Sequence, residues 1–340
     1  MGFSILSKNS GRPTSYFHVG THKTGTTSLQ VFLTANEARL AAGGIAVPRA
    51  GRRSAQSDAA DGGHHNLAWG AMGDRRFAPE SGSFKDVLVE IAGLQKPKIV
   101  LSAEGFEFLH TKLAELKRWK QALAAIGYDA RIVVYLRPQT EYVESLYAGL
   151  VRRPIDRSFR EFLEEILTDG AFRFRDRVYQ FDYLTLVESF ASVFGPENII
   201  ARRYISKAPP EFLYQDFLAA VGADTLDFSP LYKPPRLNQT PTYRAVLEAL
   251  RSNACQHGRP AVTLPALLRE LFGHADTRLL DHRFDALQRD EQEALIERFS
   301  DSNRTLVHQY GVSLVSRWSS FDKAAQKRRQ VLDAAMQRWR

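Results

Sequence analysis

The chain has 340 residues, of which 44% are hydrophobic and 25% are charged. These values are typical of globular proteins, and they exclude disorder, collagen and a coiled coil for most of the chain. Lysines and arginines number 46 against 38 acidic residues, which gives a net charge of +8. A positive charge favours an anionic partner, a class that includes nucleic acid, phosphorylated cofactors, acidic glycans and membrane surfaces.

The single cysteine, Cys255, excludes a disulfide within the chain and favours a reducing compartment. No stretch approaches the roughly 20 apolar residues that span a bilayer. The first residues lack the basic segment and the apolar run of a signal peptide. Leu6 also stands where N-myristoylation needs Ser or Thr. We therefore expect a cytoplasmic protein with no transmembrane segment.

Short apolar runs alternate with helical spacing along the first half of the chain. Strands are predicted at 15–19, 98–102 and 131–136, and helices at 26–42, 84–94, 107–126 and 138–152. The segment 49–83 is rich in Gly, Ser, Asp, Arg and Ala, and it is predicted to be a long excursion or mobile loop.

The second half of the chain is mainly helical in its pattern. Helices are predicted at 158–168 and 180–194, a strand at 198–204, and further helices at 211–221, 241–252, 289–310 and 321–340. Strands that alternate with helices of this length favour an α/β fold, with an open parallel sheet and helices on both faces. Ligands bind such sheets at the carboxyl ends of the strands, which directs attention to the loops at 20–27, 102–106 and 136–145 and after residue 204.

The loop after the first strand has the composition of an anion site. It reads Gly20-Thr-His-Lys23-Thr-Gly25-Thr-Thr-Ser28, and it leads from the strand into a helix. Backbone N–H groups at the start of a helix attract anions, and Lys23 adds a positive charge. Gly20 and Gly25 have the separation of the ATP-binding pattern G-x-x-x-x-G-K-[ST], but Thr26 stands where that pattern has lysine.

The order K-[ST]-G-T-[ST] after a strand resembles the 5′-phosphosulfate loop of the sulfotransferases that use 3′-phosphoadenosine-5′-phosphosulfate (PAPS). The likeness extends over the run HVGTHKTGTTSLQ from His18. The second signature of that family, an arginine at a strand end and a serine eight residues on, is similar to Arg137 and Ser145. The resemblance implies a P-loop-like fold of three layers over 15–240, and 241–340 would be a helical C-terminal extension.

The resemblance also implies roles for individual residues. Lys23 would contact the bridging oxygen and the 5′-phosphate, while Arg137 and Ser145 would hold the 3′-phosphate. The 5′-phosphate would be held by Thr24, Gly25, Thr26, Thr27 and Ser28, and later contacts to the nucleotide would come from Arg236 and Asn238. The desulfated product would be adenosine-3′,5′-bisphosphate (PAP), and no metal is implied.

Two departures separate this chain from the cytosolic sulfotransferases. Ser28 stands where those enzymes carry a tryptophan against the adenine, and their late R-K-G sequence is absent. The segment 234–240 resembles instead the asparagine-centred element of bacterial and glycan sulfotransferases. The acceptor stays open among glycans, lipids and small molecules, and activity itself stays open.

Glu104 is our first candidate for the general base that deprotonates the acceptor, because it follows the strand 98–102. It could equally cap a helix or form an ion pair. His64 and His65 compete for this role from a glycine-flanked loop, although a loop histidine anchored by Leu67 and Trp69 is the simpler interpretation. His22 either shapes the phosphate loop or contacts the substrate.

The basic end of the chain, with Lys323, Lys327, Arg328, Arg329 and Arg338, allows three interpretations. It could bind an acidic surface, or it could be a solvated helix that packs through Phe321, Val331, Leu332 and Met336. It could also join two copies of the chain into an oligomer.

Two other classes of function compete with a sulfotransferase. A P-loop kinase or NTPase would need a lysine after Gly25 and a strand-end aspartate for Mg²⁺, which Thr26 and Glu104 match poorly. A non-catalytic protein that binds anions or nucleic acid would account for the charge. The basic residues are spread through the chain rather than clustered, so we expect no nucleic acid partner.

Overall fold

The computed structural model describes residues 11–52, 62–153, 155, 157–235, 237, 240–259, 261–315 and 323–339. The chain divides into two compact units. The first comprises Met1–Arg137, Tyr183–Asn238 and Asn303–Ser313, and the second comprises Pro138–Asp182, Gln239–Ser302 and Leu314–Arg340. Each unit is formed from several separate segments of the chain. The predicted domains, 15–240 and 241–340, are consecutive instead. The boundary at residue 240 stays a prediction.

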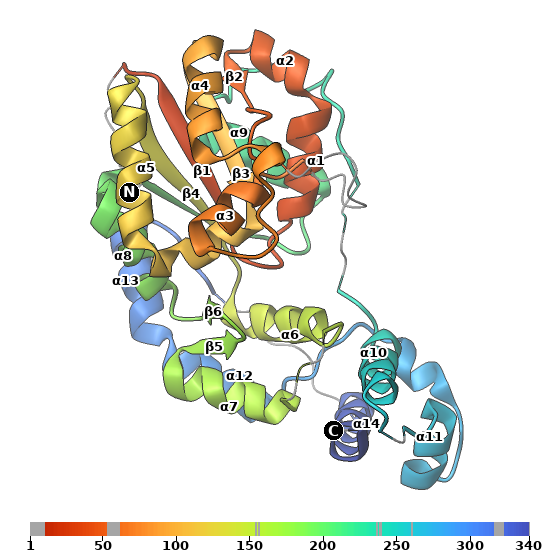
Figure 1. Cartoon of the computed structure of the whole chain (residues 1–340). Helices are drawn as coiled ribbons and strands as arrows, with labels where there is room; N and C mark the ends of the chain where they lie inside the picture. The colour runs from red at the N-terminus through yellow and green to blue at the C-terminus, as the bar shows by residue number, and fades with distance from the viewer. Residues whose placement is uncertain are drawn as a thin grey trace. The chain divides into compact units, whose positions relative to one another are not determined.

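The first unit is built on a parallel sheet of five strands (Figure 1). The strands are β1 (Thr14–Gly20), β2 (Ile45–Ala46), β3 (Lys98–Ala103), β4 (Asp129–Leu136) and β7 (Ile199–Arg203). Their order is β2-β3-β1-β4-β7, so β1 lies at the centre between β3 and β4. Every residue of β1 is buried, as expected for a strand that helices cover on both faces. The predicted α/β fold with a parallel sheet is confirmed.

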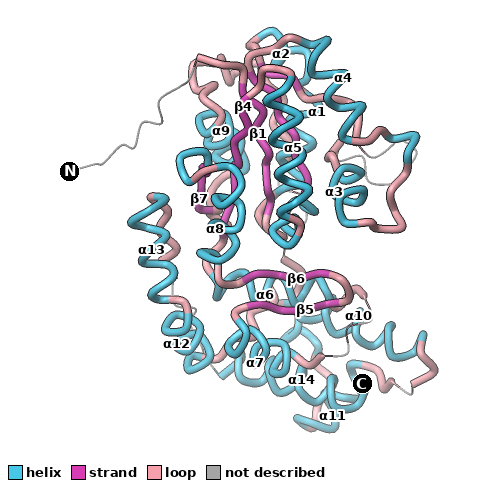
Figure 2. Tube along the Cα trace, turned by 60° about the vertical axis from the view of Figure 1, so that its left-hand side comes forward, coloured by secondary structure: helices cyan, strands magenta, loops and turns pink. Residues whose placement is uncertain are grey.

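Alternate residues of β1 point into two different hydrophobic layers. Tyr16 belongs to the core cluster shared with α1 (Thr26–Ala35), α2 (Glu37–Ala42) and α9 (Pro210–Ala220). Phe17 stacks on Trp119 of α5 (Leu113–Ala125) and contacts Phe194 of α8 (Tyr183–Phe194). Because successive side chains of a strand point to opposite faces, these contacts place helices on both sides of the sheet. Figure 2 shows the sheet between α9 and α5.

The structure corrects three predicted elements of the first unit. The segment expected to be an excursion at 49–83 contains α3 (His65–Met72) and the short 3-10 helix η1 (Pro79–Ser81), and α4 (Phe84–Leu94) follows it. The helix predicted at 107–126 is two elements, the 3-10 helix η2 (Glu104–Thr111) and α5. The helix predicted at 26–42 likewise breaks at Asn36. Apolar spacing alone does not separate a 3-10 turn from an α-helix, and it does not reveal a break that keeps the same buried face.

The second unit is mainly helical, as predicted for the C-terminal region. Its elements are α6 (Gln139–Leu150), α7 (Phe159–Asp169), β5 (Ala171–Phe174), β6 (Arg177–Gln180), α10 (Tyr243–Gln256), α11 (Leu264–Phe272), η4 (Thr277–Asp281), α12 (Arg289–Arg298) and α14 (Lys323–Trp339). The antiparallel hairpin of β5 and β6 was not expected, because strands of four residues carry little periodic signal. The helix expected at 289–310 breaks at Phe299 into α12 and α13 (Ser300–Tyr310).

Helix α14 packs through Val331, Leu332 and Met336, as predicted, while Phe321 lies outside the described residues. Its arginines correct the expectation of a fully solvated basic face. Arg328 and Arg329 are only 5% and 4% exposed. Arg328 bonds Asp285, and Arg329 bonds both Glu291 and Asp333. Their charges are therefore neutralised inside the unit.

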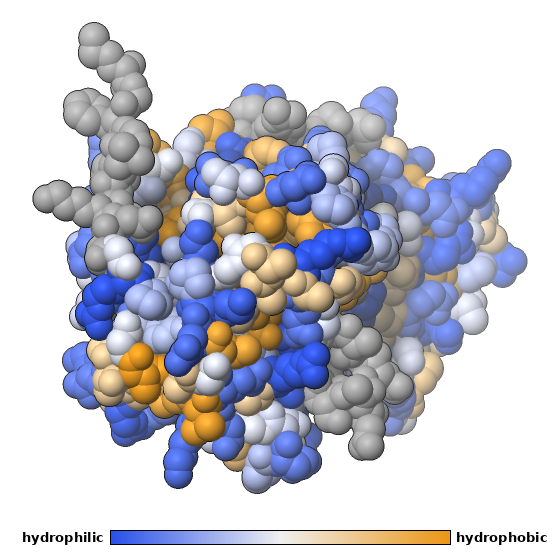
Figure 3. Space-filling model, turned by 90° about the horizontal axis from the view of Figure 1, so that it is seen from above, coloured by the Kyte–Doolittle hydropathy of each residue, from blue (hydrophilic) through white to orange (hydrophobic). Residues whose placement is uncertain are grey.

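Within the part of the chain that the structure describes, no helix is long and apolar enough to cross a membrane. Figure 3 shows hydrophilic residues over much of one face of the molecule, with hydrophobic residues scattered between them. This mixture is the usual composition of a surface in contact with water.

A buried polar network supports the carboxyl end of β3. Ser102 Oγ lies 2.8 Å from His18 Nδ1, and Gln30 Nε2 donates to the Ser102 carbonyl oxygen at 3.3 Å. The Ser102 N–H donates to His64 Nδ1 at 3.1 Å, and His64 Nε2 lies 2.9 Å from the Pro48 carbonyl oxygen. His64 is therefore held as the neutral tautomer with its proton on Nε2. The network ties β1, α1 and the start of α3 to the same strand end.

Both histidines of this network are buried, which opposes their positive form. Burial lowers the pKa of His18 to about 3. Burial and the nearby Arg52 charge lower the pKa of His64 to about 3 as well. In the unfolded chain each imidazole has a pKa of about 6.5. The unfolded chain therefore binds more protons between these two values, and the free energy of unfolding falls as the pH falls through this window.

We predict that acidification destabilises the protein partly through these two side chains. Between pH 7.5 and pH 5 each histidine removes about 2 kcal/mol from the free energy of unfolding, because protonation favours the unfolded chain. The substitution His64→Gln removes one of these contributions and flattens the pH dependence, while the exposed control His308→Gln leaves it unchanged. Urea unfolding followed by tryptophan fluorescence at several pH values measures the slope. Identical slopes for His64→Gln and the unmodified protein would contradict the assignment.

Candidate functional site

The strand order creates one crevice at the carboxyl edge of the sheet. After β1 the chain continues to β2, which lies on the β3 side of β1. After β4 it continues to β7, which lies on the opposite side of the sheet. Neighbouring strands whose connections leave in opposite directions form a crevice between their carboxyl ends, where ligands bind in α/β folds. The loop that follows β1 and Arg137, which follows β4, border this crevice.

The loop after β1 is held by its own hydroxyl groups. Thr21 Oγ1 donates to the Tyr135 carbonyl oxygen at 2.7 Å, and Thr24 Oγ1 donates to the Thr21 carbonyl oxygen at 2.6 Å. Gly25 has a φ of 79°, and a Cβ atom there would lie 2.8 Å from Leu213 Cδ2. The left-handed conformation favours glycine at 25, whereas the contact with Leu213 involves the end of a flexible side chain that can move.

The start of α1 has no side-chain cap of its own. The residue before the helix is Gly25, which has no side chain, and the first turn contains no acidic residue. The first N–H groups of a helix have no partner within that helix. Among the described residues, Thr26 Oγ1 is buried with no hydrogen-bond partner, and it would lie 1.9 Å from a Cβ atom on Gly20. An uncapped helix start beside a glycine turn is an arrangement that can bind an anion.

Two cations lie at this loop. Lys23 has a φ of 69°, which is left-handed and strained for a residue with a side chain. Arg137 is 4% exposed, and its Nη1 donates to the Lys23 carbonyl oxygen at 3.3 Å. The Arg137 guanidinium also lies over the Tyr204 ring, 5.9 Å from its centre. The structure therefore brings Lys23 and Arg137 together, as the strand-end positions predicted.

Ser28 anchors a later segment of the chain to α1. Its Oγ accepts a hydrogen bond from the Leu237 N–H at 2.9 Å. Asn36, the residue that follows α1, bonds both the carbonyl oxygen and the N–H of Tyr232, so Tyr232 and Leu237 are each held at one end of this helix. Thr27 lies in the same first turn of the helix. The predicted nucleotide contacts Arg236 and Asn238 lie outside the described residues.

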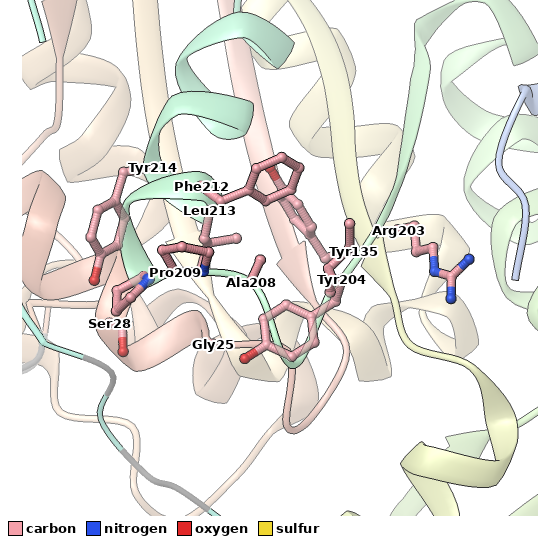
Figure 4. Close-up of a pocket in the computed structure, with 12 residues that line it drawn as sticks. Gly25, Ser28, Tyr135, Arg203, Tyr204, Ala208, Pro209, Phe212, Leu213 and Tyr214 are labelled. Atoms are coloured by element: carbon pink, nitrogen blue, oxygen red, sulfur yellow. The ribbon is translucent and has the colours of Figure 1, made fainter. Parts of the chain in front are cut away.

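A small pocket of about 20 Å³ opens beside the loop (Figure 4). Its lining includes Gly25, Ser28, Tyr204 and Tyr214, and the figure shows Tyr204 beside Gly25. The Tyr214 hydroxyl donates to the Pro234 carbonyl oxygen at 2.8 Å. Sequence reasoning marked the segment after residue 204 but did not single out Tyr204, which comes directly after β7 and supplies an aromatic face to this end of the sheet.

Two carboxylates and one imidazole face each other on the other side of β1. Glu107 is fully buried, and its Oε2 accepts from the His22 N–H at 2.9 Å and lies 2.6 Å from His22 Nδ1. A carboxylate only accepts hydrogen bonds, so Nδ1 carries the proton in this pair. His22 Nε2 lies 3.5 Å from Glu104 Oε2, and the Glu104 side chain is 36% exposed. Glu107 thus fixes His22, and His22 in turn faces the more accessible Glu104.

Sequence reasoning singled out Glu104 and His22 and missed Glu107. The signal was present in the spacing. Glu104 and Glu107 are three residues apart, and in a 3-10 helix such as η2 this spacing places two side chains on the same side. The segment was instead assigned to an α-helix beginning at 107, which concealed the relation.

The two adjacent histidines of α3 have different surroundings. His64 is fully buried, and both of its ring nitrogens are hydrogen-bonded. We therefore assign it a structural role rather than that of the general base. His65 is half-buried at the first position of α3, and its ring stacks on Trp69 at 6.0 Å. A role for His65 at the site stays a prediction.

Ser145, which the sequence pairs with Arg137, lies on α6 and belongs to the second unit. It is buried, and its pairing with Arg137 stays a prediction. In the described ranges, no group of three or more His, Cys, Asp and Glu side chains is arranged to hold a metal ion.

Comparison with known proteins adds little to this geometry. No protein-family model matches the chain. It is similar to an uncharacterized protein of Archaeoglobus fulgidus, with 29% identity over 127 residues. The matched region is 37% of this chain and spans only 30% of the archaeal protein.

We predict that the strained backbone of Lys23 costs stability. Lys23→Gly and Lys23→Ala both remove the charge, but only glycine relieves the left-handed conformation. Lys23→Gly is therefore expected to be about 0.5–1 kcal/mol more stable to urea than Lys23→Ala. Lys117, an exposed residue inside α5, is the control position, because glycine in a helix interior is about 1 kcal/mol less stable than alanine and the order should therefore be reversed there. Equal stability of the two Lys23 variants would show that the loop stores no strain at this residue.

Proposed function

We propose that the protein is a sulfotransferase that moves the sulfuryl group of PAPS to a hydroxyl or amine of an acceptor. The observation that carries the proposal is the start of α1, where Gly25 offers no side-chain cap and Lys23 lies in the same loop. There the buried Thr26 hydroxyl has no hydrogen-bond partner among the described residues. A phosphate group would satisfy the helix N–H groups and this hydroxyl together. The protein would act on this substrate without a metal, and PAP would be released.

The two cations support a ligand with two separate phosphate groups. Lys23 lies in the turn itself, while Arg137 comes from the neighbouring strand across the crevice. The 5′-phosphosulfate would occupy the loop, held by the residues from Thr24 to Ser28, and Arg137 would bind the 3′-phosphate through its planar guanidinium. Ser145, Arg236 and Asn238 are further nucleotide contacts in this proposal. Tyr204, between Gly25 and Arg137, offers a ring surface for the adenine.

The same positions argue against a P-loop kinase or NTPase. In those enzymes the loop lysine follows the second glycine and a strand-end aspartate holds Mg²⁺. Here Thr26 follows Gly25, and the carboxylate after β3 is Glu104, which faces His22. A non-catalytic anion-binding protein would need the loop but would have no use for Glu104, His22 and Glu107 beside it.

The carboxylate cluster supports a route for the acceptor's proton. In the transfer a bond forms between the acceptor oxygen or nitrogen and sulfur while the bond from sulfur to the bridging oxygen breaks. Glu104 accepts the proton that the acceptor loses, and His22, fixed by Glu107, orients Glu104. Lys23 neutralises the negative charge that develops on the leaving oxygen. His65 remains the competing base.

We propose the acceptor only as a broad class, which comprises glycans, lipids and small molecules. A cytoplasmic location belongs to the proposal too, supported by the single exposed Cys255, which suits a reducing compartment. The basic C-terminal helix α14 is the proposed contact in an oligomer. Residues other than Arg328 and Arg329 would form this contact.

We predict that calorimetric titration will detect binding of PAP but much weaker binding of ATP and 5′-AMP. Arg137→Ala will weaken the binding of PAP by at least about tenfold, because a charge-assisted contact to the 3′-phosphate is lost. It will leave 5′-AMP, which lacks that phosphate, nearly unchanged. Arg39→Ala, an exposed arginine of α2, is the matched control. Equal losses for PAP and 5′-AMP would remove the assigned role of Arg137, and equal affinity for ATP would favour an NTPase.

We also predict that Glu104→Gln slows sulfuryl transfer by about 10²-fold or more, the usual contribution of a general base. Binding of PAP should change little, because Glu104 does not contact the phosphate groups. Release of PAP from PAPS is measured with the fastest substrate from a panel of hydroxyl and amine acceptors. The exposed Glu211→Gln controls for loss of a carboxylate. Unchanged turnover would assign the base to His65 or another group.

A further inference from the structure

The first unit contains a second and much larger cavity, a groove of about 700 Å³ that is open to solvent, between α3, α4 and α5. Its lining comes from these helices and from residues 73–83, and it includes no residue of the phosphate loop. Folded interiors are packed nearly as densely as organic crystals. Cavities of this size are typical of sites that enclose a small organic molecule.

Asn66, which lines the cavity, fixes the neighbouring segment 78–82. Asn66 is fully buried, and its Nδ2 donates to the carbonyl oxygens of Ala78 and Gly82, at 2.8 Å each. Its Oδ1 accepts from the Ala78 N–H at 2.8 Å, and the Gly51 N–H bonds the Ser81 carbonyl oxygen at 2.7 Å. The segment held by these bonds connects Phe77 and Ser83, which both line the cavity.

Aromatic side chains make up much of the apolar lining. Trp119 is 3% exposed and stacks on Phe84, with ring centres 4.4 Å apart and planes at 10°. The Trp119 Nε1 donates to Glu115 Oε1 at 2.9 Å, which fixes the indole and satisfies its polar atom. Phe77 adds a third ring to the lining. Trp119 is covered by Phe17 as well as by Phe84, so the half-buried rings of Phe77 and Phe84 are those that a flat organic body can reach.

The charged groups of the lining leave an excess of positive charge. Both of its carboxylates are already bonded: Asp74 to Arg76, with 2.9 Å between Arg76 Nε and Asp74 Oδ1, and Glu115 to Trp119 and Arg118. Arg75 and Lys85 are exposed at the cavity, and neither forms an ion pair with any described residue. The Lys85 charge acts on the exposed Asp86 beside it and contributes to the lowered pKa of that carboxyl, but the two residues form no ion pair. Arg75 and Lys85 are therefore the cations that an anionic group on a ligand would meet at the cavity.

We propose that this cavity binds an aromatic anion, a molecule with a flat apolar body and a carboxylate, sulfonate or sulfate group. The body lies against Phe77 and Phe84, and the anionic group meets Arg75 and Lys85. The proposal does not depend on the phosphate loop or on sulfuryl transfer, and its test uses neither PAPS nor an acceptor.

The test compares two fluorescent probes that share their rings and differ in charge. The probe 8-anilinonaphthalene-1-sulfonate carries a sulfonate, and N-phenyl-1-naphthylamine has the same rings without it. The native protein should bind the sulfonate at one saturable site, and more tightly than the neutral probe. Arg75→Ala and Lys85→Ala should each weaken binding of the sulfonate probe by about fivefold, as expected for one exposed ion pair. Binding of the neutral probe should not change. Both residues are exposed, so these variants will fold.

A second pair of variants tests the location of the probes. Ala122→Trp on α5 fills the cavity and should weaken both probes by at least about tenfold through steric overlap. Ala124→Trp, an exposed residue of the same helix that does not line the cavity, should change neither. Equal binding of the sulfonate to the native protein and to Ala122→Trp would overturn the site. Equal effects of Lys85→Ala on both probes would overturn the role of charge, and absence of saturable binding would overturn the proposal entirely.

Discussion

The structure of the first unit depends on one constraint, the direct passage from the central strand β1 into α1. Thr26 sits so close to Gly20 that no side chain fits there, and Gly25 adopts a conformation that favours glycine. The helix starts without a side-chain cap, and the Thr26 hydroxyl has no partner among the described residues. A buried hydroxyl without a partner costs free energy, and an anion bound at this helix start could accept a hydrogen bond from it.

Charges of opposite sign are separated around this passage. Lys23 and Arg137 lie together at the crevice between β1 and β4, whereas Glu104 and Glu107 follow β3 on the other side of β1 and hold His22. In the proposed reaction the cations bind the phosphate groups and the carboxylates receive the acceptor's proton. The buried network centred on Ser102 fixes the strand end that leads into Glu104. The donor side and the acceptor side are thus built from neighbouring strand ends of one sheet.

Much of this arrangement could be predicted from the sequence, because apolar strands, glycine positions and strand-end polar residues are local signals. The parallel sheet, the glycine turn from Gly20 to Ser28 and the strand-end position of Arg137 are of this kind. Features that depend on contacts between distant residues were missed. The role of Glu107 follows from the 3-10 geometry of η2, which the sequence pattern did not reveal. The role of Tyr204 follows from its contacts with Gly25 and Arg137, which are distant in the sequence. His64 resembled a loop base, but its bonds to Pro48 and Ser102 make it structural.

The most direct test of the central claim, that the turn into α1 binds a phosphate group, is hydrogen–deuterium exchange of the whole chain with and without PAP. Backbone N–H groups that bond a ligand exchange more slowly than those that face water. We predict slower exchange with PAP in peptides that cover residues 20–30, together with the peptide that contains Arg137, and little change at α4. Unchanged exchange at 20–30 under saturating PAP would contradict the account, because the loop would then have no role in binding the nucleotide.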